Sequence, residues 1–244
     1  MEEKIAIISE IYPSIQGEGI YVGTKQVFVR FAGCNLHCSY CDTVYSRKFQ
    51  PYCMLGKRRL KNPITLDKAR EIVTRYKKGI HSICLTGGEP LMQSDFLSAF
   101  AQRLKKDGYT IYLETNGTMP DAMEIIIHWV DIVSCDIKAP TDCGGVLWEE
   151  HRRFLQILSR VIPLKKIFVK FVVTKKTKRS ELGKAVSLLQ DIGMDIPLII
   201  QPVTPKGKIK PPSLRKIVSF VEYASKFIKE VRVIPQIHRL AGWK

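Results

Sequence analysis

The segment FAGCNLHCSYCDT, residues 31–43, contains three closely spaced cysteines: Cys34, Cys38 and Cys41. A structural zinc ion would need a fourth ligand, and the nearby candidates are His37, squeezed between two of the cysteines, and Cys53. Three thiolates by themselves can hold a four-iron cluster and leave one iron open to another ligand. The spacing alone leaves both sites open.

The composition is that of a globular protein. The chain has 244 residues, of which 45% are hydrophobic and 25% charged, and a chain of this length can bury a sizeable core. It has no run of about 18 apolar residues that would span a membrane, and its first residues lack the pattern of a secretory signal. Seven cysteines, an odd number, fit a reducing compartment with a metal or redox site. We therefore expect a cytoplasmic protein.

Basic residues outnumber acidic ones, 39 against 23, for a net charge of +16. They gather in four clusters, at residues 57–61, 165–170, 175–179 and 206–210. Nucleic-acid binding would explain such charge, but the clusters lie far apart in the sequence and lack the interleaved aromatic residues of single-strand-binding proteins. We expect a solvated lysine-rich surface that attracts an acidic substrate or protein, without direct nucleic-acid binding.

Short apolar runs alternate with helical patterns along most of the chain. The pattern predicts strands at residues 25–33, 82–88, 110–117, 131–140, 166–174, 197–203 and 230–238. It predicts helices at residues 65–78, 95–108, 151–161, 180–193 and 214–228, with a short helical or buried segment at 123–130. This alternation favours an α/β fold with a parallel sheet of at least six strands. We expect one domain over residues 1–244, with an irregular basic loop at about 44–63.

The cysteine spacing, directly after a predicted strand, resembles the CxxxCxxC signature of the radical S-adenosylmethionine (SAM) superfamily. The resemblance implies a partial (β/α)6-type barrel whose helical covering can be reduced, with a [4Fe-4S] cluster on the three cysteines of the loop at 33–43. In that superfamily SAM binds the open iron, and one electron cleaves it to a 5′-deoxyadenosyl radical. The segments TGGEP (86–90) and SCDIK (134–138) match further superfamily motifs. The implied SAM-binding residues are Tyr40, Gly88, Glu89, Ser134, Asp136, Lys138 and Gln201.

Those two segments also allow plainer interpretations. Because glycine lacks a Cβ, TGGEP lets the backbone approach a ligand closely, but a simple turn between a strand and a helix has the same composition. Likewise, Asp136 and Lys138 fit a surface ion pair as well as a ligand site. The remaining cysteines carry no assignment: Cys84 and Cys135 lie in strand patterns and are expected to be buried, whereas Cys53 and Cys143 are expected in loops.

Motifs near both ends of the chain point to one family within this superfamily. QGEG at 16–19, Arg30, Thr43 and VRVIPQIHRLAGW at 231–243 closely resemble 7-carboxy-7-deazaguanine synthase, and the resemblance runs nearly end to end. That family contracts the ring of 6-carboxy-5,6,7,8-tetrahydropterin and thereby supplies the precursor of queuosine-type tRNA bases. The implied substrate-binding residues are Ile15, Gln16, Gly17, Glu18, Arg30, Thr86, Glu114 and His238.

The same resemblance implies a mechanism. The adenosyl radical takes a hydrogen atom beside the substrate carboxylate, the ring contracts, the hydrogen atom returns to regenerate SAM, and ammonia is lost. The Thr43 hydroxyl resembles a ligand for Mg²⁺, which would orient the substrate. The planar guanidinium of Arg30 suits a carboxylate, and the loop at 16–18 offers acceptors for the pterin edge.

Three other functions stay open from the sequence. A glycyl-radical activating enzyme shares the cysteines, but the QGEG loop and the segment 231–243 argue against it. A basic zinc protein that binds nucleic acid would differ in metal and sulfide content. A radical enzyme that modifies tRNA itself would be expected to carry an added RNA-binding domain. As partners we expect a low-potential donor such as flavodoxin or ferredoxin, and a second copy of the chain in a homodimer.

Overall fold

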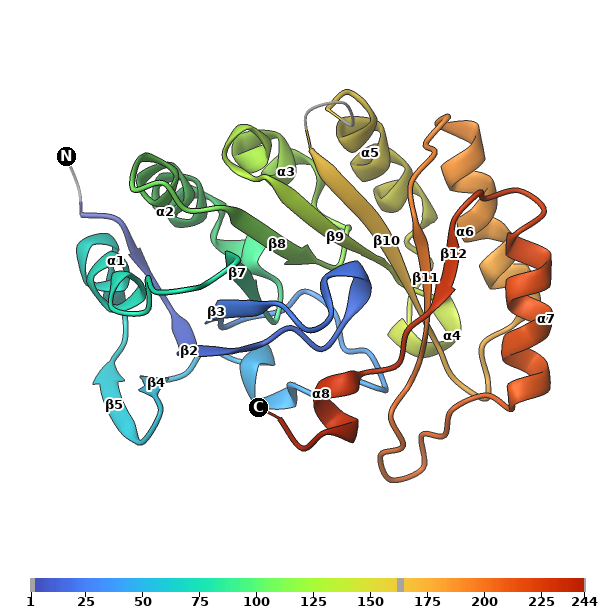
Figure 1. The fold of residues 1–244 in the computed structure, drawn as a ribbon, viewed down its shortest axis with the longest axis horizontal. Coiled ribbons are helices and arrows are strands. Elements are labelled where there is room, and N and C mark those ends of the chain that lie inside the picture. Colours follow the sequence, from blue (N-terminus) through green and yellow to red (C-terminus); the bar gives the residue numbers. More distant parts are fainter. Residues whose placement is uncertain (1–2, 162–164, 244) are drawn as a thin grey trace.

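The computed structural model describes residues 3–161 and 165–243, and its centre is a ten-stranded sheet (Figure 1). Seven neighbouring strands run parallel: β3 Lys25–Phe31, β7 Ser82–Gly87, β8 Ile111–Thr115, β9 Ile132–Ile137, β10 Lys166–Val173, β11 Leu198–Pro202 and β12 Val231–Val233. They lie side by side in chain order. In the described part of the chain the two outer strands of the sheet do not pair with each other, so the barrel is partial, as predicted.

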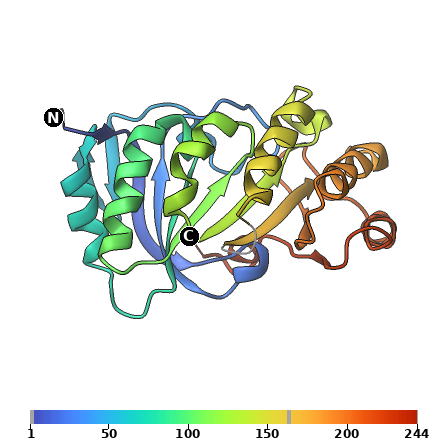
Figure 2. The same ribbon diagram turned by 90° about the horizontal axis from the view of Figure 1, so that it is seen from above.

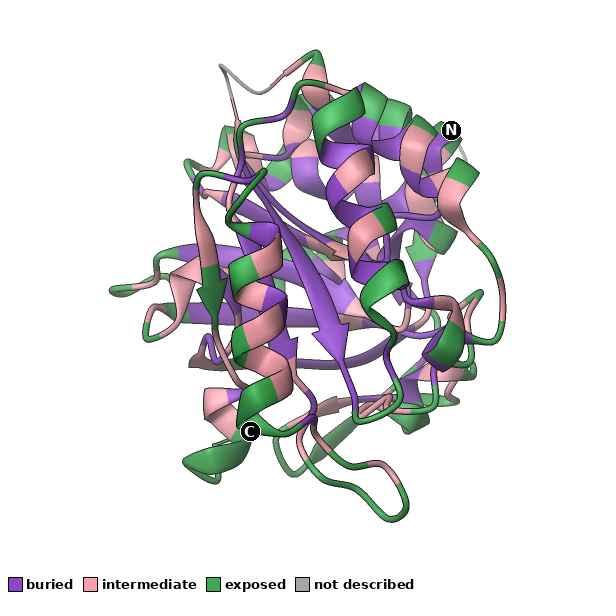
Figure 3. Cartoon of the chain, turned by 90° about the vertical axis from the view of Figure 1, so that its right-hand side faces the viewer, coloured by how far each residue is buried: buried purple, intermediate pink, exposed green. Residues whose placement is uncertain are grey.

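Helices connect these strands and cover one face of the sheet (Figures 1 and 2). The connecting helices are α1 Leu66–Thr74, α2 Ser94–Lys106, α3 Pro120–Ile126, α5 Trp148–Ser159, α6 Arg179–Asp191 and α7 Leu214–Ala224. Their apolar sides and the facing sheet side chains form the main core, drawn as the purple band in Figure 3. The predicted α/β class is therefore confirmed. No helix among the described residues combines the length and apolar character needed to cross a membrane.

The sequence pattern missed a rim of strands around the N-terminal part of the sheet. β2 Ile8–Ile15 pairs antiparallel with β3, and the hairpin of β4 Tyr52–Leu55 and β5 Arg58–Lys61 extends the sheet beyond β2. A further short pair joins β1 Ile5–Ala6 to β6 Ile64–Thr65.

The prediction of an irregular loop at 44–63 is therefore wrong for residues 52–61. A two-residue turn joins β4 to β5, and its Gly56 has a positive φ of 63°, a conformation suited to tight hairpins. Cys53 lies in β4 and is fully buried, and Cys143 is buried in the short helix α4 Pro140–Cys143. Neither is a loop thiol. Cys84 and Cys135 are fully buried, as expected.

The last predicted strand is shorter than expected. It ends at Val233, and α8 Ile237–Leu240 follows where the sequence suggested more strand. Pro235 interrupts the segment, and proline cannot donate a hydrogen bond to a neighbouring strand. His238 consequently lies on a short helix and not on a strand.

The inner face of the sheet carries two layers of side chains. The lower layer is apolar and consists of Tyr12, Phe28, Cys84, Tyr112, Ile132, Phe168 and Ile199. The 3-10 helix η1 Gly19–Tyr21 packs on it, with the Tyr21 ring 5.7 Å from that of Tyr112. Because alternate residues of a strand share a face, the inward residues two positions further along lie above this floor: Arg30, Thr86, Glu114, Ser134, Lys170 and Gln201. This upper layer is polar and marks the site.

Candidate active site

A cavity opens above the polar layer, at the carboxyl ends of the parallel strands. Its wall includes every predicted site residue except Glu89. The predicted residues on the wall are Ile15, Gln16, Gly17, Glu18, Arg30, Cys34, Cys38, Tyr40, Cys41, Thr43, Thr86, Gly88, Glu114, Ser134, Asp136, Lys138, Gln201 and His238. Residues that are distant in the sequence therefore meet where open α/β sheets usually bind ligands.

The loop after β3 presents the three cysteines to this cavity. Arg47 donates to the carbonyl of Cys38, and the Ser39 N–H donates to the Asp142 carbonyl at 2.8 Å. Burial raises the pKa of both Cys34 and Cys38, and the nearby Lys138 cation acts against this. An electropositive neighbour of this kind favours thiolates, the form that binds iron.

Neither of the two fourth ligands considered from the sequence is placed to join these cysteines. His37 is exposed and does not line the cavity, and Cys53 is buried in β4. Neither candidate for a closed zinc site therefore faces the three thiols. The donor set fits a cluster with one open iron.

Two buried acceptors on the opposite wall lack a partner. Within the described residues, Asp136 Oδ1 and Gln201 Oε1 accept no hydrogen bond, although burying such an oxygen costs about 1–3 kcal/mol. Both residues line the cavity, so a ligand with hydroxyl or amino donors would satisfy them. This fits bound SAM.

The ion pair weighed as a plain alternative does exist, but inside the cavity wall. Lys138 Nζ lies 2.7 Å from Asp136 Oδ2, and the two side chains are only 10% and 15% exposed. The same ammonium lies 5.6 Å from the centre of the Tyr40 ring. Three predicted SAM-binding residues thus form one contiguous group.

The glycines of TGGEP also allow a close contact within the protein. A Cβ on Gly88 would lie 2.0 Å from the Gly33 carbonyl oxygen, and one on Gly87 would lie 2.2 Å from that of Phe31. The Gly88 and Glu89 N–H groups donate to the Phe31 and Gly33 carbonyls at 3.0 and 2.8 Å. The missing side chains therefore let the end of β7 pack on the start of the cysteine loop, in addition to leaving Gly88 on the wall.

Glu89 occupies a different place from the predicted one. Its side chain is fully buried, does not line the cavity, and accepts hydrogen bonds from Leu91 N (3.1 Å), Thr115 Oγ1 (2.9 Å) and Asn116 N (2.7 Å). Burial raises the pKa of Glu89 to about 7 against the effect of these donors. Its carboxyl group fixes the β8–α3 connection behind the wall.

The predicted substrate residues form a hydrogen-bonded chain. Gln16 Nε2 donates to Glu114 Oε1 at 3.0 Å, and Thr86 Oγ1 donates to Glu114 Oε2 at 2.8 Å. Arg30 is anchored from below, because Glu10 Oε1 lies 2.9 Å from its Nε and Tyr12 Oη lies 2.8 Å from its Nη2. These side chains are held in fixed orientations before any ligand binds.

Lys170 is the main residue that the sequence analysis missed. It was counted with the solvated basic cluster at 165–170, but its side chain is 6% exposed, pairs with Glu18 and lies 3.7 Å from Asp136 Oδ2. Burial opposes the charge on Glu18, yet Lys170 outweighs it and lowers the pKa of Glu18 to about 2. A lysine at an inward position of an otherwise apolar strand was the available signal.

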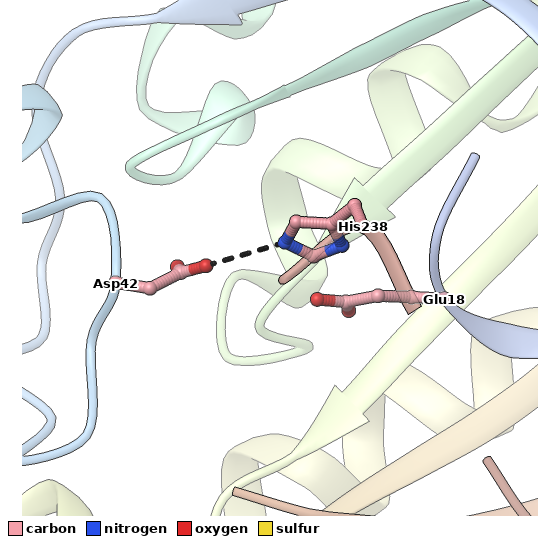
Figure 4. Close-up of side chains that lie close together, drawn as sticks. All are labelled: Glu18, Asp42 and His238. Carbon is pink, nitrogen blue, oxygen red and sulfur yellow. Dashed lines mark ion pairs between the residues drawn. The ribbon is translucent and has the colours of Figure 1, made fainter. Parts of the chain in front are cut away.

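Glu18, Asp42 and His238 converge from three segments (Figure 4). Ligand atoms of the three lie within 4.8 Å of one another, a grouping that a metal ion can use. Both carboxylates, however, already have cationic neighbours, because Glu18 pairs with Lys170 and Asp42 lies 3.2 Å from Arg239. The His238 ring nitrogen Nε2 lies 3.7 Å from the Asp42 carboxylate. Despite its burial, these neighbours lower the pKa of Asp42.

This group closes the cavity with the C-terminal segment. The Ile237 N–H donates to the Gly17 carbonyl at 2.9 Å, and a Cβ on Gly17 would lie 2.4 Å from His238 Nδ1. The glycine expected to admit the pterin therefore also admits α8. Thr43, half-buried on the same wall, has its hydroxyl 3.8 Å from Cys41 Sγ.

The family model of the Radical SAM superfamily matches residues 28–189. A 7-carboxy-7-deazaguanine synthase of Geobacter sulfurreducens is 39% identical over 257 aligned residues, which cover 99% of each chain. The chain belongs to the 7-carboxy-7-deazaguanine synthase family. A relative of the same name from Methanocaldococcus jannaschii is 32% identical over 97% of this chain and 99% of its own.

The structural comparison agrees with this family. The crystal structure of QueE from Escherichia coli matches with a TM-score of 0.65 over 96% of this chain and 95% of that one, at 18% identity. It shows that the fold is shared. The chain is thus a radical SAM enzyme, and its superfamily implies a [4Fe-4S] cluster and SAM. The zinc protein and the activating enzyme are wrong as interpretations of the sequence.

Proposed function

We propose that this enzyme converts 6-carboxy-5,6,7,8-tetrahydropterin to 7-carboxy-7-deazaguanine with loss of ammonia, and that the product feeds queuosine-type tRNA modification. The observation that carries the proposal is the composition of one cavity. On one side it presents three unpaired cysteines, and on the other a fixed set of acceptors made by Gln16, Glu18 and Glu114.

On the cofactor side, Cys34, Cys38 and Cys41 would hold the cluster. When bound, the cluster and SAM supply the radical that removes hydrogen from the substrate. Asp136 Oδ1 has no partner among the described side chains and suits a ribose hydroxyl, and the Lys138 ammonium suits the SAM carboxylate. Tyr40, Gly88, Ser134 and Gln201 complete the proposed SAM site.

On the substrate side, the protein's task is recognition and orientation. The amine and amide edge of a pterin presents donors, which Glu114 and Glu18 accept, and Lys170 keeps Glu18 ionised by lowering its pKa to about 2. The guanidinium of Arg30, anchored by Glu10 and Tyr12, suits the substrate carboxylate. Ile15, Gly17, Thr86 and His238 complete this wall, and α8 limits the access of water.

We further propose that Thr43 is the protein ligand of Mg²⁺. A threonine hydroxyl is a hard oxygen ligand, and Mg²⁺ usually keeps several waters or substrate oxygens in its shell. The position of Thr43 on the cavity wall, directly after Asp42, supports a shared ion and substrate site. The ion would stabilise charge during the rearrangement.

The test is anaerobic reconstitution with iron and sulfide, followed by incubation with SAM, Mg²⁺, dithionite and the pterin. We expect mass spectrometry to detect 7-carboxy-7-deazaguanine. Cys38→Ala should abolish both the product and the visible absorption of the cluster, and Thr43→Ala should weaken turnover and raise the Mg²⁺ concentration that it requires. Cys53→Ala removes a buried thiol outside the cavity and is the matched control. Cleavage of SAM without conversion of the pterin would rule out the proposed substrate.

We also propose a cytoplasmic homodimer. Its seven free thiols suit a reducing compartment. The exposed apolar side chains of Leu214 and Val218, one turn apart on α7, are available for contact between copies. Sedimentation velocity at several protein concentrations tests the dimer.

A further inference from the structure

Two basic clusters that are far apart in the sequence meet in the fold. Lys175 N donates to the Lys210 carbonyl at 2.8 Å, and Lys216 Nζ donates to the Lys175 carbonyl at 2.8 Å. The two segments are the connections that follow β10 and β11. Because both leave the carboxyl ends of parallel strands, they lie on the same edge of the sheet as the cavity. Figure 1 shows the second connection, in orange, below β11 and near α8.

The surface they form is strongly positive. We call it the basic ledge and define it by six exposed lysines: Lys175, Lys176, Lys178, Lys206, Lys208 and Lys210. Residues 175–180 and 203–221 contain no aspartate or glutamate. The first carboxylate that follows, Glu181, is buried and accepts from the Lys178 and Thr141 N–H groups. The ledge therefore presents its positive charge to solvent.

The ledge also touches the cysteine loop. Lys206 Nζ donates to the Cys41 carbonyl at 3.0 Å, so the main chain of a proposed cluster ligand lies directly behind it. A tight turn pairs Lys206 with Ile209 at 3.1 and 2.9 Å, and Gly207 within it has a φ of 56°. This turn fixes the ledge next to the loop while Lys208 and Lys210 remain exposed.

We propose that the basic ledge is the docking surface for an acidic protein that delivers single electrons to the cluster held by Cys34, Cys38 and Cys41. In each encounter the donor loses one electron, the cluster gains one, and no covalent bond changes. The inference rests on the cluster that the radical SAM family implies, and not on the identity of the pterin substrate. Charge complementarity steers such encounters, and contact at Cys41 gives a short route for the electron.

A nucleic acid is the competing partner for a lysine surface. Binding to single strands usually combines positive charge with aromatic side chains that stack on the bases. Residues 174–180 and 203–219 contain no phenylalanine, tyrosine or tryptophan. The ledge therefore offers charge without a stacking surface, which favours an acidic protein.

The test compares two double charge reversals that change the net charge equally. Lys208→Glu/Lys210→Glu reverses the ledge, whereas Lys77→Glu/Lys78→Glu reverses two exposed lysines in the turn between α1 and β7, which precedes a strand and lies on the opposite edge. The probe is an acidic flavodoxin. The readouts are its Kd for each variant, the rate at which its hydroquinone reduces the cluster, and turnover with dithionite.

We expect the ledge variant to weaken flavodoxin binding and to slow cluster reduction by about tenfold or more at low salt. The control should behave as wild type. The difference should disappear in about 1 M salt, where the Debye length is about 3 Å. Turnover with dithionite, a small reductant that needs no docking surface, should stay unchanged in both variants.

Equal effects of the two double variants would overturn the proposal, since only net charge would then matter. Unchanged flavodoxin kinetics together with lost binding of bulk tRNA would also overturn it and assign the ledge to nucleic acid. Suppose that flavodoxin reduces the wild-type cluster but that the wild type makes no deazaguanine with dithionite. The proposed pterin substrate would then be ruled out, and the docking surface would remain supported.

Discussion

The two walls of the cavity are held together in different ways. The strand-end wall, built on β7, β8 and β9, is fixed by short hydrogen bonds within the sheet and its connections, such as those to Glu89. The terminal wall joins the QGEG loop to the C-terminal segment, and Gln236 Nε2 reaches Glu18 Oε1 across 218 residues of sequence at 2.9 Å. Charged pairs made by these segments add to the hydrogen bond from the Ile237 N–H to the Gly17 carbonyl.

Two buried carboxyl groups show what this difference means. Glu89, behind the strand-end wall, has hydrogen-bond donors but no ion pair in the described structure, and burial raises its pKa to about 7. Glu18 on the terminal wall is also desolvated, but Lys170 lowers its pKa to about 2. The strand-end wall therefore tolerates a neutral acid, whereas the terminal wall requires an ionised one.

The largest expected effect comes from removing the cation that links the walls. In Lys170→Met, the carboxylates of Glu18 and Asp136 lose their shared partner, and breaking a buried pair costs about 3–5 kcal/mol. We expect urea denaturation to show a loss of that order in the free energy of unfolding. Lys166→Met, at the exposed start of the same strand, should change it by less than about 0.5 kcal/mol. Equal stability of the two variants would show that the walls do not depend on this cation.

The second effect concerns Glu89. In Glu89→Gln the new amide cannot accept at both oxygen positions, so one of three donors is left without a partner, at a cost of about 1–3 kcal/mol. The wild type itself loses folding stability at high pH. Since its folded pKa of about 7 exceeds the 4.5 of the unfolded chain, the folded state binds more protons between these values, and stability falls as the pH rises through them.

The variant should therefore gain stability relative to wild type between pH 5, where the wild-type carboxyl is neutral like the amide, and pH 8, because only the wild type loses stability in between. Urea midpoints at both values measure this. Glu222→Gln, at an exposed position on α7, is the matched control and should follow the wild type at both. A constant difference between Glu89→Gln and wild type across this range would mean that Glu89 does not titrate there.

The sequence located the strand-end wall well because its signals are local. The family resemblance implied Thr86, Ser134 and Gln201, and the motif LETNG indicated Glu114. Each lies near the end of an apolar strand, where alternation along the strand places it on the inner face. The cysteine loop is likewise contained in eight residues, from Cys34 to Cys41. What each of these residues binds stays a prediction.

The rest depends on contacts that no local pattern encodes. The side chain of Glu89 turns away from the cavity because Thr115 and Asn116, more than twenty residues later, receive it. Lys170 is buried because Glu18, 152 residues earlier, neutralises it. The β4–β5 hairpin escaped notice because β5 is mostly exposed and basic, so it lacks the apolar alternation that marks a strand.

The smallest expected effect is on the terminal wall itself. Arg239 and Asp42 form a partly exposed ion pair, with side chains 43% and 30% exposed, and such pairs contribute about 0–1 kcal/mol. We expect Arg239→Ala to leave the free energy of unfolding nearly unchanged but to speed hydrogen exchange of the Ile237 amide, which bonds to Gly17, because local opening needs less free energy than global unfolding.

Arg232→Ala, which breaks a comparable exposed pair with Glu230 on the other side of Pro235, should leave that exchange unaltered. High salt should reproduce the effect of Arg239→Ala in the wild type, since screening weakens an exposed pair far more than a buried one. If the Ile237 amide exchanges equally slowly in Arg239→Ala and in wild type, the hydrogen bonds of Gln236 and Ile237 alone hold the terminal wall. Of these charged contacts, only the pair of Lys170 with Glu18 would then be needed to hold the terminal wall.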